Sequence, residues 1–174
     1  LVLHALSLPL DRLEVFLDAR LTQHERAKLG ELLARRIDAR VPAAYLTREA
    51  WLGEFRFYVD ERVIIPRSFI AELLPDGLTQ WNPDPAAIGT AFDLCTGSGC
   101  LAILLAHAYP EADVDAVDLS SDALAVAQRN VADYGLEGRI TLQQSDLFAA
   151  LGSRRYDLII SNPPYVDPAD PALL

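Results

Sequence analysis

The segment from residue 91 onward alternates short apolar stretches with longer stretches of helical periodicity. Strand-like stretches lie at 91–95, 114–118, 139–144 and 156–161, and helix-like stretches lie at 99–108 and 121–134. Two successive strands joined through a helix pair in parallel, and the crossover between them is right-handed. The alternation therefore predicts an α/β fold with a parallel sheet, whose ligands bind at the carboxyl ends of the strands.

The N-terminal part of the chain is predicted to be helical. Apolar residues at helical spacing indicate a first helix near 10–20. Thr22 and Glu25 form the pattern of a capping box, so a second helix is expected to begin there and to stop before Pro42. The apolar positions of this second helix are expected to form a buried stripe: Leu29, Leu32, Leu33 and Ile37.

A β-hairpin and a linker are predicted in the middle of the chain. Apolar residues alternate from Trp51 to Val59, and Asp60-Glu61 resembles a turn, so a hairpin is expected over 50–65. Ser68 is placed to cap a short helix ending at Leu74-Pro75, and 75–90 is rich in Pro and Gly, as linkers are. We therefore expect three parts: a helical domain at 1–45, hairpin and linker at 46–90, and an α/β domain at 91–174.

Composition excludes several classes of protein. Of the 174 residues 51% are hydrophobic and 23% are charged, which excludes a disordered chain or a coiled coil. No run approaches about 18 apolar residues, so no association with a membrane is expected. The net charge of −10 argues against direct binding to nucleic acid, which needs Lys and Arg to neutralise phosphate. Residues 91–174 hold 12 acidic and 4 basic side chains, which favours a basic partner.

Cysteine, histidine and methionine usage adds three expectations. Cys95 and Cys100 lie close together without a second pair, as reduced thiols of a cytoplasmic protein do. The histidines at positions 4, 24 and 107 are scattered, so no metal site is expected. The chain contains no methionine and begins with Leu1, from which we expect an excised or incomplete sequence.

The glycine-containing segment 93–99, Asp93-Leu94-Cys95-Thr96-Gly97-Ser98-Gly99, joins the first strand of the predicted sheet to its helix. Glycines let the backbone approach a ligand, and a helix N-terminus presents free N–H groups to an anion. Asp118 ends the next strand, where a carboxylate can accept hydrogen bonds from ribose hydroxyls. A nucleoside-containing ligand is predicted, but NAD and S-adenosylmethionine both remain open, because Gly97 to Ala102 also fits the dinucleotide pattern G-x-G-x-x-A.

Asn162-Pro163-Pro164-Tyr165 follows the fourth predicted strand and favours S-adenosylmethionine. Two prolines remove backbone donors and leave carbonyl acceptors, Asn162 adds an acceptor, and Tyr165 offers an aromatic wall. Such a site can bind both N–H groups of a planar amide and turn its nitrogen toward an electrophile, so that catalysis is mainly positioning and electrostatics. Hydride transfer has no evident use for this tetrad.

Ser145-Asp146-Leu147-Phe148 follows the third predicted strand. Asp146 can accept a hydrogen bond from an adenine amino group, and Leu147 can cover the face of the ring. The alternative is that Asp146 caps a short helix over 147–151.

Four ordered motifs together resemble the HemK-type protein N5-glutamine methyltransferases: D-L-C-T-G-S-G at 93–99, A-V-D at 116–118, S-D-L-F at 145–148 and S-N-P-P-Y-V-D at 161–167. The resemblance covers essentially the whole chain. It implies a class I S-adenosylmethionine-dependent methyltransferase domain with a Rossmann-like fold, preceded by a small helical domain with a β-hairpin. One branch of the family methylates a glutamine of peptide-chain release factors, and the other a glutamine of the large ribosomal subunit protein L-three.

The sequence motifs at 65–73 and 94–99 resemble those of the ribosomal-protein branch. The chain has Ile65-Pro66-Arg67-Ser68-Phe69 where the release-factor branch usually has I-P-R-P-E-T, and L-C-T-G-S-G at 94–99 where that branch has L-G-T-G-T-G. Two residues depart from the pattern: Cys95 replaces the first glycine of the loop, and Phe69 stands where the branch more often has proline. We therefore expect N5-methylation of a glutamine in protein L-three, with release factors as the alternative substrate.

The resemblance also implies roles for individual residues. Asp93 and the loop from Cys95 to Gly99 (Cys95, Thr96, Gly97, Ser98, Gly99) would hold the methionine end of S-adenosylmethionine, Asp118 the ribose, and Asp146 with Leu147 the adenine. Asn162, Pro163, Pro164 and Tyr165 would bind the substrate glutamine, with Asn162, Pro163 and Tyr165 catalytic and Asn162 also touching the cofactor. The N-terminal helices would recognise the protein substrate.

The family fold has about seven strands in the order 3-2-1-4-5-7-6, and this chain accounts for the first four. We therefore expect a C-terminally incomplete methyltransferase domain, with its fourth strand at an open edge of the sheet. Two hypotheses for a different function stay open. The chain is either an NAD-dependent oxidoreductase on the same nucleotide-binding scaffold or an inactive fragment that retains the fold of the enzyme.

Overall fold

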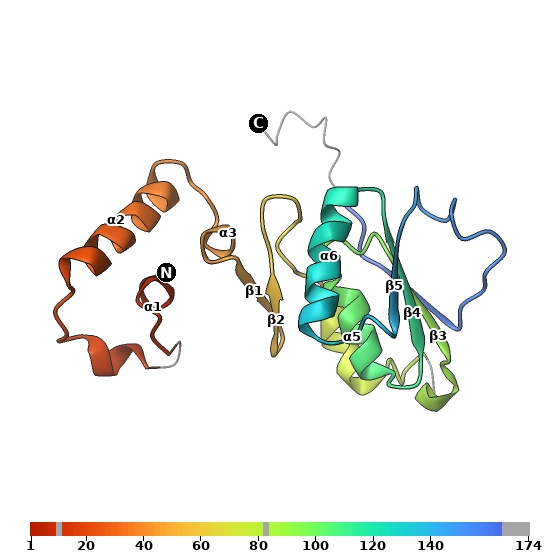
Figure 1. Ribbon diagram of the computed structural model, residues 1–174. Helices are drawn as coiled ribbons and strands as arrows, with labels where there is room; N and C mark the ends of the chain where they lie inside the picture. The colour runs from red at the N-terminus through yellow and green to blue at the C-terminus, as the bar shows by residue number, and fades with distance from the viewer. Residues whose placement is uncertain (10–11, 82–83, 165–174) are drawn as a thin grey trace.

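Four parallel strands form the central sheet of the computed structural model, which describes residues 1–9, 12–81 and 84–164 (Figure 1). The strands are β3 (Thr90–Leu94), β4 (Asp113–Asp118), β5 (Ile140–Gln144) and β6 (Leu158–Ser161), in the spatial order β5-β4-β3-β6. Every pairing in this sheet is parallel. The predicted strands, their direction and the 3-2-1-4 order of the first four strands are confirmed.

Two helices cover one face of the sheet, α5 (Cys100–Ala108) and α6 (Ser121–Asp133) (Figure 1). The ends of α6 follow the sequence signals: the Ser120 hydroxyl accepts from the Ala123 N–H at 3.2 Å, and Gly135 has a φ of 65° beyond the helix. In α5 every residue from Cys100 to Ala106 is buried. A helix that is apolar all round must be covered on every side, so α5 lies at the centre of the core.

The largest core cluster joins α5 to the sheet and to segments from the middle of the chain. Ala91 of β3 and Val114 of β4 face α5 from the sheet, and Phe57 and Leu74 cover it from the other side. Neighbouring strand residues point to the opposite face, where Phe92, Val117 and Leu151 form a second cluster. The 147–151 segment, which packs on this second face, consists of turns and not of the helix considered as the alternative for Asp146.

The hairpin differs from its prediction. It consists of β1 (Glu49–Leu52) and β2 (Phe55–Tyr58), paired antiparallel with Leu52 opposite Phe55. The turn is therefore at Gly53-Glu54, and not at Asp60-Glu61. Gly53 has a φ of 61°, which a two-residue hairpin turn requires of its first residue and which glycine adopts without strain. The apolar residues keep their alternate spacing in sequence across the turn, but Trp51 pairs with Arg56 and therefore lies on the opposite face of the hairpin from Phe55 and Phe57.

The N-terminal helices are α1 (Val2–Ala5), α2 (Gln23–Ile37) and α3 (Ala43–Thr47), which lie on the far side of the hairpin from the sheet (Figure 1). The capping box is confirmed: the Thr22 hydroxyl accepts from the Glu25 N–H at 3.3 Å, and the Glu25 carboxylate accepts from the Thr22 N–H at 2.8 Å. The helix expected near 10–20 was wrong, since only the 3₁₀ turn η1 (Leu13–Phe16) forms among the described residues there.

The buried stripe expected on α2 was also wrong, because α2 has no buried residue. Ile37 is 68% exposed and Leu33 37% exposed, whereas Leu29 and Leu32 are half-buried. The contacts of α2 with α1 and α3 therefore cover its apolar face only in part.

Between the hairpin and the sheet the chain forms three short helical turns: α4 (Ile70–Leu73), η2 (Leu74–Asp76) and η3 (Pro85–Ala87). The Ser68 hydroxyl accepts from the Ile70 N–H at 3.2 Å, near the predicted cap. Part of the predicted linker is held in place, because the Tyr109 hydroxyl at the end of α5 donates to the Gly77 carbonyl at 2.9 Å.

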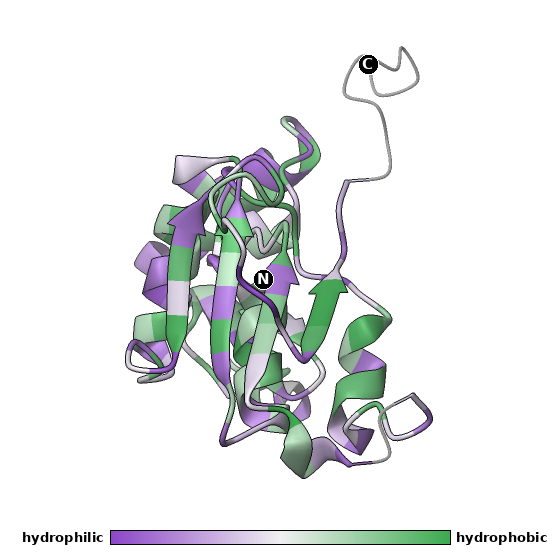
Figure 2. Cartoon of the chain, turned by 90° about the vertical axis from the view of Figure 1, so that its right-hand side faces the viewer, coloured by the Kyte–Doolittle hydropathy of each residue, from purple (hydrophilic) through white to green (hydrophobic). Residues whose placement is uncertain are grey.

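Among the described strands, β6 pairs only with β3 and so lies at one edge of the sheet, as expected. It is hydrophobic along most of its length (Figure 2), and Ile159 is 49% exposed. None of the described helices has the length and apolarity required to cross a bilayer.

Arg139, which directly precedes β5, stabilises the end of α5. Its guanidinium donates to the carbonyl oxygens of Ala106 at 2.9 Å and Tyr109 at 2.7 Å, and also to that of Ala112. The last carbonyls of a helix have no partner within the helix, so one side chain here satisfies three acceptors that flank the helix end.

We expect Arg139→Ala to lower the free energy of unfolding by about 1–3 kcal/mol, because half-buried carbonyls lose their donor. Arg139→Lys should recover only part of the loss, because an ammonium cannot reproduce the planar fork of a guanidinium. Urea denaturation measures both. Arg155→Ala, at an exposed arginine, is the control, and an equal loss there would contradict this role of Arg139.

Candidate functional site

The turn between β3 and α5 contains three residues with positive φ: Cys95 at 64°, Gly97 at 55° and Gly99 at 78°. Left-handed backbone favours glycine, so Cys95 holds a conformation that glycine adopts more readily. The turn is fixed by backbone bonds, from the Thr96 N–H to the Val117 carbonyl and from the Gly99 N–H to the Thr96 carbonyl, both at 2.9 Å.

Gly99 allows a close approach of this turn to α6. A Cβ atom on Gly99 would lie 3.0 Å from the Cβ of Ala127 and 3.2 Å from its Cα. A larger residue at position 99 would push the turn away from α6. Glycine is thus required here by both backbone conformation and space.

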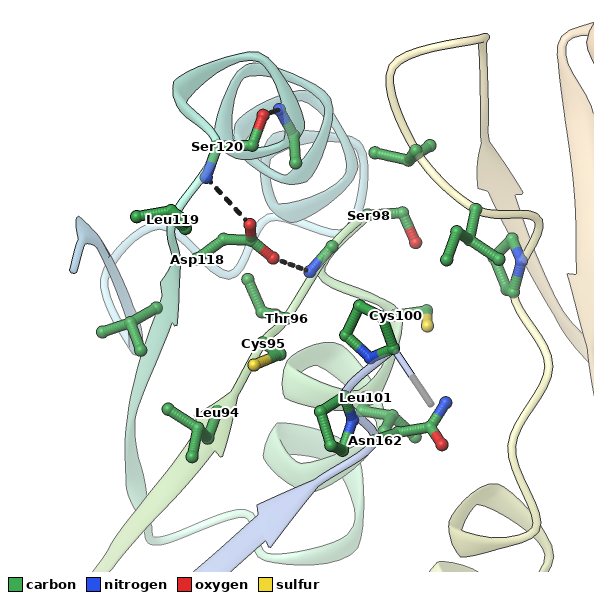
Figure 3. A pocket seen from close by; sticks show the side chains of 18 of the residues that line it. Leu94, Cys95, Thr96, Ser98, Cys100, Leu101, Asp118, Leu119, Ser120 and Asn162 are labelled. Atoms are coloured by element: carbon green, nitrogen blue, oxygen red, sulfur yellow. Dashed lines mark hydrogen bonds between the residues drawn. The ribbon is translucent and has the colours of Figure 1, made fainter. Parts of the chain in front are cut away.

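Asp118, at the carboxyl end of β4, holds the turn from the other side (Figure 3). Its Oδ2 accepts from the Gly97 N–H at 2.8 Å and its Oδ1 from the Ser120 N–H at 3.0 Å. Each carboxylate oxygen can accept more than one hydrogen bond, so both retain capacity for a ligand hydroxyl. The carboxylate is therefore oriented by the protein and still able to bind ribose.

A pocket of about 640 Å³ opens over these residues. Its lining comes from the segment 62–68, from the β3–α5 turn, from the end of β4 and start of α6, and from the residues after β5 and β6: Arg62–Ser68, Leu94–Ser98, Cys100, Leu101, Val117–Ser120, Ala123, Ser145–Leu147 and Asn162–Pro164. The volume is in the range that small-molecule and cofactor sites occupy.

Most of the residues expected to bind ligand line this pocket. Those predicted for the cofactor are Cys95, Thr96, Gly97, Ser98, Asp118, Asp146, Leu147 and Asn162, and those predicted for the substrate are Pro163 and Pro164. Tyr165 lies outside the described residues. Asp93 and Gly99 do not line the pocket; Asp93 has no exposed surface.

The Asn162 side chain is oriented by a contact that the motif alone did not indicate. Its Nδ2 donates to the backbone carbonyl of Arg67 at 3.1 Å. The amide nitrogen of Asn162 thus faces the 62–68 segment, which leaves the carbonyl oxygen Oδ1 as the group available to an incoming donor.

The segment 62–68 was not identified as part of a ligand site from its sequence. We expected 62–65 to be the second strand of the hairpin, whereas it is irregular and lines the pocket. The sequence signal that could have identified this segment is the apolar run Val63-Ile64-Ile65, which ends at a proline. In the structure Ile64 is 62% exposed.

Leu147 has a φ of 47° and a side chain that is 54% exposed beside the pocket. Its carbonyl accepts from the Ser145 hydroxyl at 2.7 Å, and the same hydroxyl accepts from the Ala150 N–H at 3.0 Å. The turn after β5 thereby holds Leu147 against the pocket, where an apolar side chain can cover an aromatic ring.

The sequence profile of the family described as "Methyltransferase small domain" matches residues 74–172, which is more than half of the chain. The chain belongs to this methyltransferase family.

Curated relatives of this methyltransferase carry a more specific name. "Ribosomal protein uL3 glutamine methyltransferase" of Bordetella pertussis (strain Tohama I) is 60% identical over 97% of the chain and 57% of its own length. The protein of the same name from Neisseria meningitidis serogroup A is 59% identical over 100% of the chain and 57% of its own length. The chain thus spans somewhat more than half the length of the relatives that it matches.

Solved structures support the fold class. The structure described as "delta-N METTL16 MTase domain" aligns over 82% of the chain and 61% of its own with a TM-score of 0.52 at 16% identity. That of "Human methyltransferase 10 domain containing protein" aligns over 81% and 62% with a TM-score of 0.50 at 17% identity. The predicted Rossmann-like methyltransferase fold is confirmed.

Neither of the cysteines that line the pocket, Cys95 and Cys100, has the properties of a nucleophile. Burial raises the pKa of Cys95, and it raises that of Cys100 to about 12. Both therefore remain thiols near neutral pH. Among the described residues, no group of three or more His, Cys, Asp or Glu side chains could hold a metal ion.

Asp93 supports the turn from within the core. Its Oδ2 accepts from the Thr96 hydroxyl at 2.6 Å, and its Oδ1 has no hydrogen-bond partner. Burial raises the pKa of Asp93 to about 7, against the lowering effects of the Thr96 hydroxyl and the Ala102 backbone N–H, and the nearby Asp118 adds to the rise. Asp93 therefore does not face the pocket, and it supports Thr96, which does.

We expect Asp93 to make stability depend on pH. The unfolded chain loses this proton near pH 4 and the folded protein near pH 7, so the folded state binds more protons between them. Stability therefore falls as pH rises through this window and levels off above it. Asp93→Asn, which cannot ionise, should gain stability relative to the natural protein between pH 5 and pH 8.

Urea denaturation at several pH values measures this difference. The control is Asp113→Asn, at an exposed aspartate, which should show no such trend. Parallel profiles for the natural protein and Asp93→Asn would contradict a raised pKa.

Proposed function

We propose that the protein transfers a methyl group from S-adenosylmethionine to the side-chain nitrogen of a glutamine in ribosomal protein uL3, the L-three protein. The observation that carries the proposal is Asn162, held by Arg67 at the pocket wall so that its Oδ1 is available to an amide N–H. The names of the relatives at 59–60% identity support the substrate. Because those relatives are longer than this chain, the activity is proposed for the whole protein.

The lining of the pocket fits S-adenosylmethionine. The Cys95–Ser98 turn would hold the methionine part, Asp118 the ribose, and Asp146 with Leu147 the adenine. Asp93 and Gly99 would act by shaping the turn. When bound, the cofactor would supply an electrophilic methyl group on a sulfonium centre. The methyl–sulfur bond would break with its electron pair left on S-adenosylhomocysteine, the carbon–nitrogen bond would form, and the nitrogen would lose one proton to water, without the need for a strong base.

The substrate glutamine would lie between Asn162 and the turn that joins β3 to α5, which we call the cofactor turn. Asn162 Oδ1 and the backbone carbonyl oxygen of Pro163 accept hydrogen bonds from the two N–H groups of the substrate amide. Neither Pro163 nor Pro164 has a backbone N–H that could compete for these acceptors. Two accepted hydrogen bonds hold the nitrogen in one orientation and favour the positive charge that develops on it. Tyr165 remains the predicted aromatic wall.

A ribosomal protein suits the charge of the chain. Residues 91–174 carry 12 acidic and 4 basic side chains, which would attract a basic partner. With such a substrate, we propose the cytoplasm as the location of the enzyme. Release factors remain the alternative substrate to compare in an assay, whereas the family match does not favour an NAD-dependent oxidoreductase.

We expect Asn162→Ala to lower kcat for uL3 methylation on the order of 10²–10³-fold, because an oriented acceptor at the reacting nitrogen is lost. The affinity for S-adenosylhomocysteine should change much less. The assay uses the full-length enzyme with purified uL3 and, in parallel, a release factor.

Asn162→Asp is the informative companion variant, since it keeps acceptor oxygens and loses the donor to Arg67. Glu137→Gln, at an exposed position away from the pocket, is the control. Undiminished methylation of uL3 by Asn162→Ala would refute the role of Asn162, and faster methylation of the release factor would reassign the substrate.

We expect the protein to bind S-adenosylhomocysteine more tightly than NADH, and Asp118→Ala to weaken the former roughly 100-fold. The loss combines the ribose contact with the two backbone N–H groups that Asp118 holds, at about 1.4 kcal/mol per tenfold change. Calorimetry measures both ligands. Asp122→Asn, an exposed acidic neighbour, should bind normally, and tighter binding of NADH would overturn the choice of cofactor.

A further inference from the structure

Asn130 of α6 is 1% exposed and does not line the pocket, yet its side chain joins two segments that are distant in sequence. Its Oδ1 accepts from the Tyr58 N–H at 2.8 Å, and its Nδ2 donates to the Tyr58 carbonyl at 3.0 Å. The same Nδ2 donates to the Ser98 carbonyl at 2.8 Å. Both N–H groups and the oxygen of one buried amide are thus used, two bonds on the hairpin and one on the cofactor turn.

The bonds to Tyr58 replace those of a neighbouring strand. A side-chain amide that binds both the N–H and the C=O of one residue completes the edge of β2 in the way that a paired strand does. Tyr134, the residue that caps the C-terminus of α6, binds Arg56 in the same manner: its hydroxyl accepts from the Arg56 N–H and donates to the Arg56 carbonyl, both at 3.0 Å. Helix α6 therefore holds the edge of the hairpin at two points.

The bond to Ser98 distinguishes Asn130 from Tyr134. The peptide between Ser98 and Gly99 is held at both ends, its carbonyl by Asn130 and its N–H by the Thr96 carbonyl at 2.9 Å. Ser98 lines the pocket and is itself buried. The orientation of this pocket-lining peptide is therefore set in part by a residue that also holds the hairpin.

The hairpin leads directly to the pocket from another direction. A few residues after β2, the chain enters the segment 62–68, which lines the pocket and binds Asn162 through the Arg67 carbonyl. A shift of β2 would thus move both the 62–68 segment, which holds Asn162, and the Ser98 peptide of the cofactor turn.

We propose that Asn130 is a positioning residue that couples the β-hairpin to the cofactor turn, so that ordering of one stabilises the other. The identity of the ligand rests on the proposed function, but the coupling itself does not. Coupling between two sites is reciprocal. A ligand in the pocket should therefore tighten the hairpin, and a substrate engaging the hairpin should tighten the pocket.

The first test is hydrogen exchange without ligand. Asn130→Ala should speed exchange roughly tenfold at residues 95–101 and at residues 55–58, because a lost bond that leaves a buried carbonyl unpaired is worth about 1.4 kcal/mol. Tyr134→Phe is the matched control, since it removes the bonds to Arg56 and should speed exchange at 55–58 alone. Gln128→Ala, exposed on the same helix, should change neither.

The second test is binding of S-adenosylhomocysteine by calorimetry, with hydrogen exchange repeated in its presence. Asn130→Ala should weaken binding roughly tenfold, and Tyr134→Phe should stay within about twofold, which separates loop positioning from hairpin stability. In the natural protein the ligand should slow exchange at 55–58, and in Asn130→Ala this protection should disappear.

Exchange at 95–101 that is unchanged in a folded Asn130→Ala variant would overturn the proposal. If that variant does not fold, the natural protein decides: absence of ligand-dependent protection at 55–58 would equally overturn it, and its presence would support it. Failure of the natural protein to bind S-adenosylhomocysteine would count against the proposed cofactor, while the exchange test without ligand would still decide the role of Asn130.

Discussion

The close packing of the β3–α5 turn against α6 is the constraint on which the site depends. A Cβ on Gly99 would come within 3.0 Å of Ala127, so the turn and the helix can approach only at a glycine. This approach brings the Ser98 carbonyl within reach of Asn130. It also leaves the Gly97 N–H pointing at Asp118. The shape of the pocket floor thus follows from one contact between a helix and a turn.

Parallel topology then gathers the remaining groups. The residues that follow β3, β4, β5 and β6 meet at one edge of the sheet because all four strands run in the same direction. The chain adds a wall that the sheet does not supply, the segment 62–68, and ties it to the motif after β6 through Asn162 and Arg67. The orientation of the Asn162 side chain is therefore set by the middle of the chain.

Local signals predicted those elements whose ends are determined by nearby residues. Thr22 with Glu25 forms a cap within one helical turn, and this cap was identified from spacing alone. The hairpin turn was misplaced because apolar alternation continues across a two-residue turn at Gly53. The stripe on α2 was misjudged because periodicity shows that a helix has an apolar face without showing what covers it.

By itself, the sequence determined the α/β class, the parallel direction of the strands and the positions of the turns at their carboxyl ends, since these depend on short-range periodicity, glycine and topology rules. The strand order was expected only from the resemblance to a family. The tertiary structure decided which residues line the pocket. It withdrew Asp93 into the core, brought in the 62–68 segment, and gave Asn130 a place between hairpin and turn. Those outcomes depend on contacts between segments that lie up to 95 residues apart, as in the bond from Asn162 to Arg67, and no local pattern specifies them.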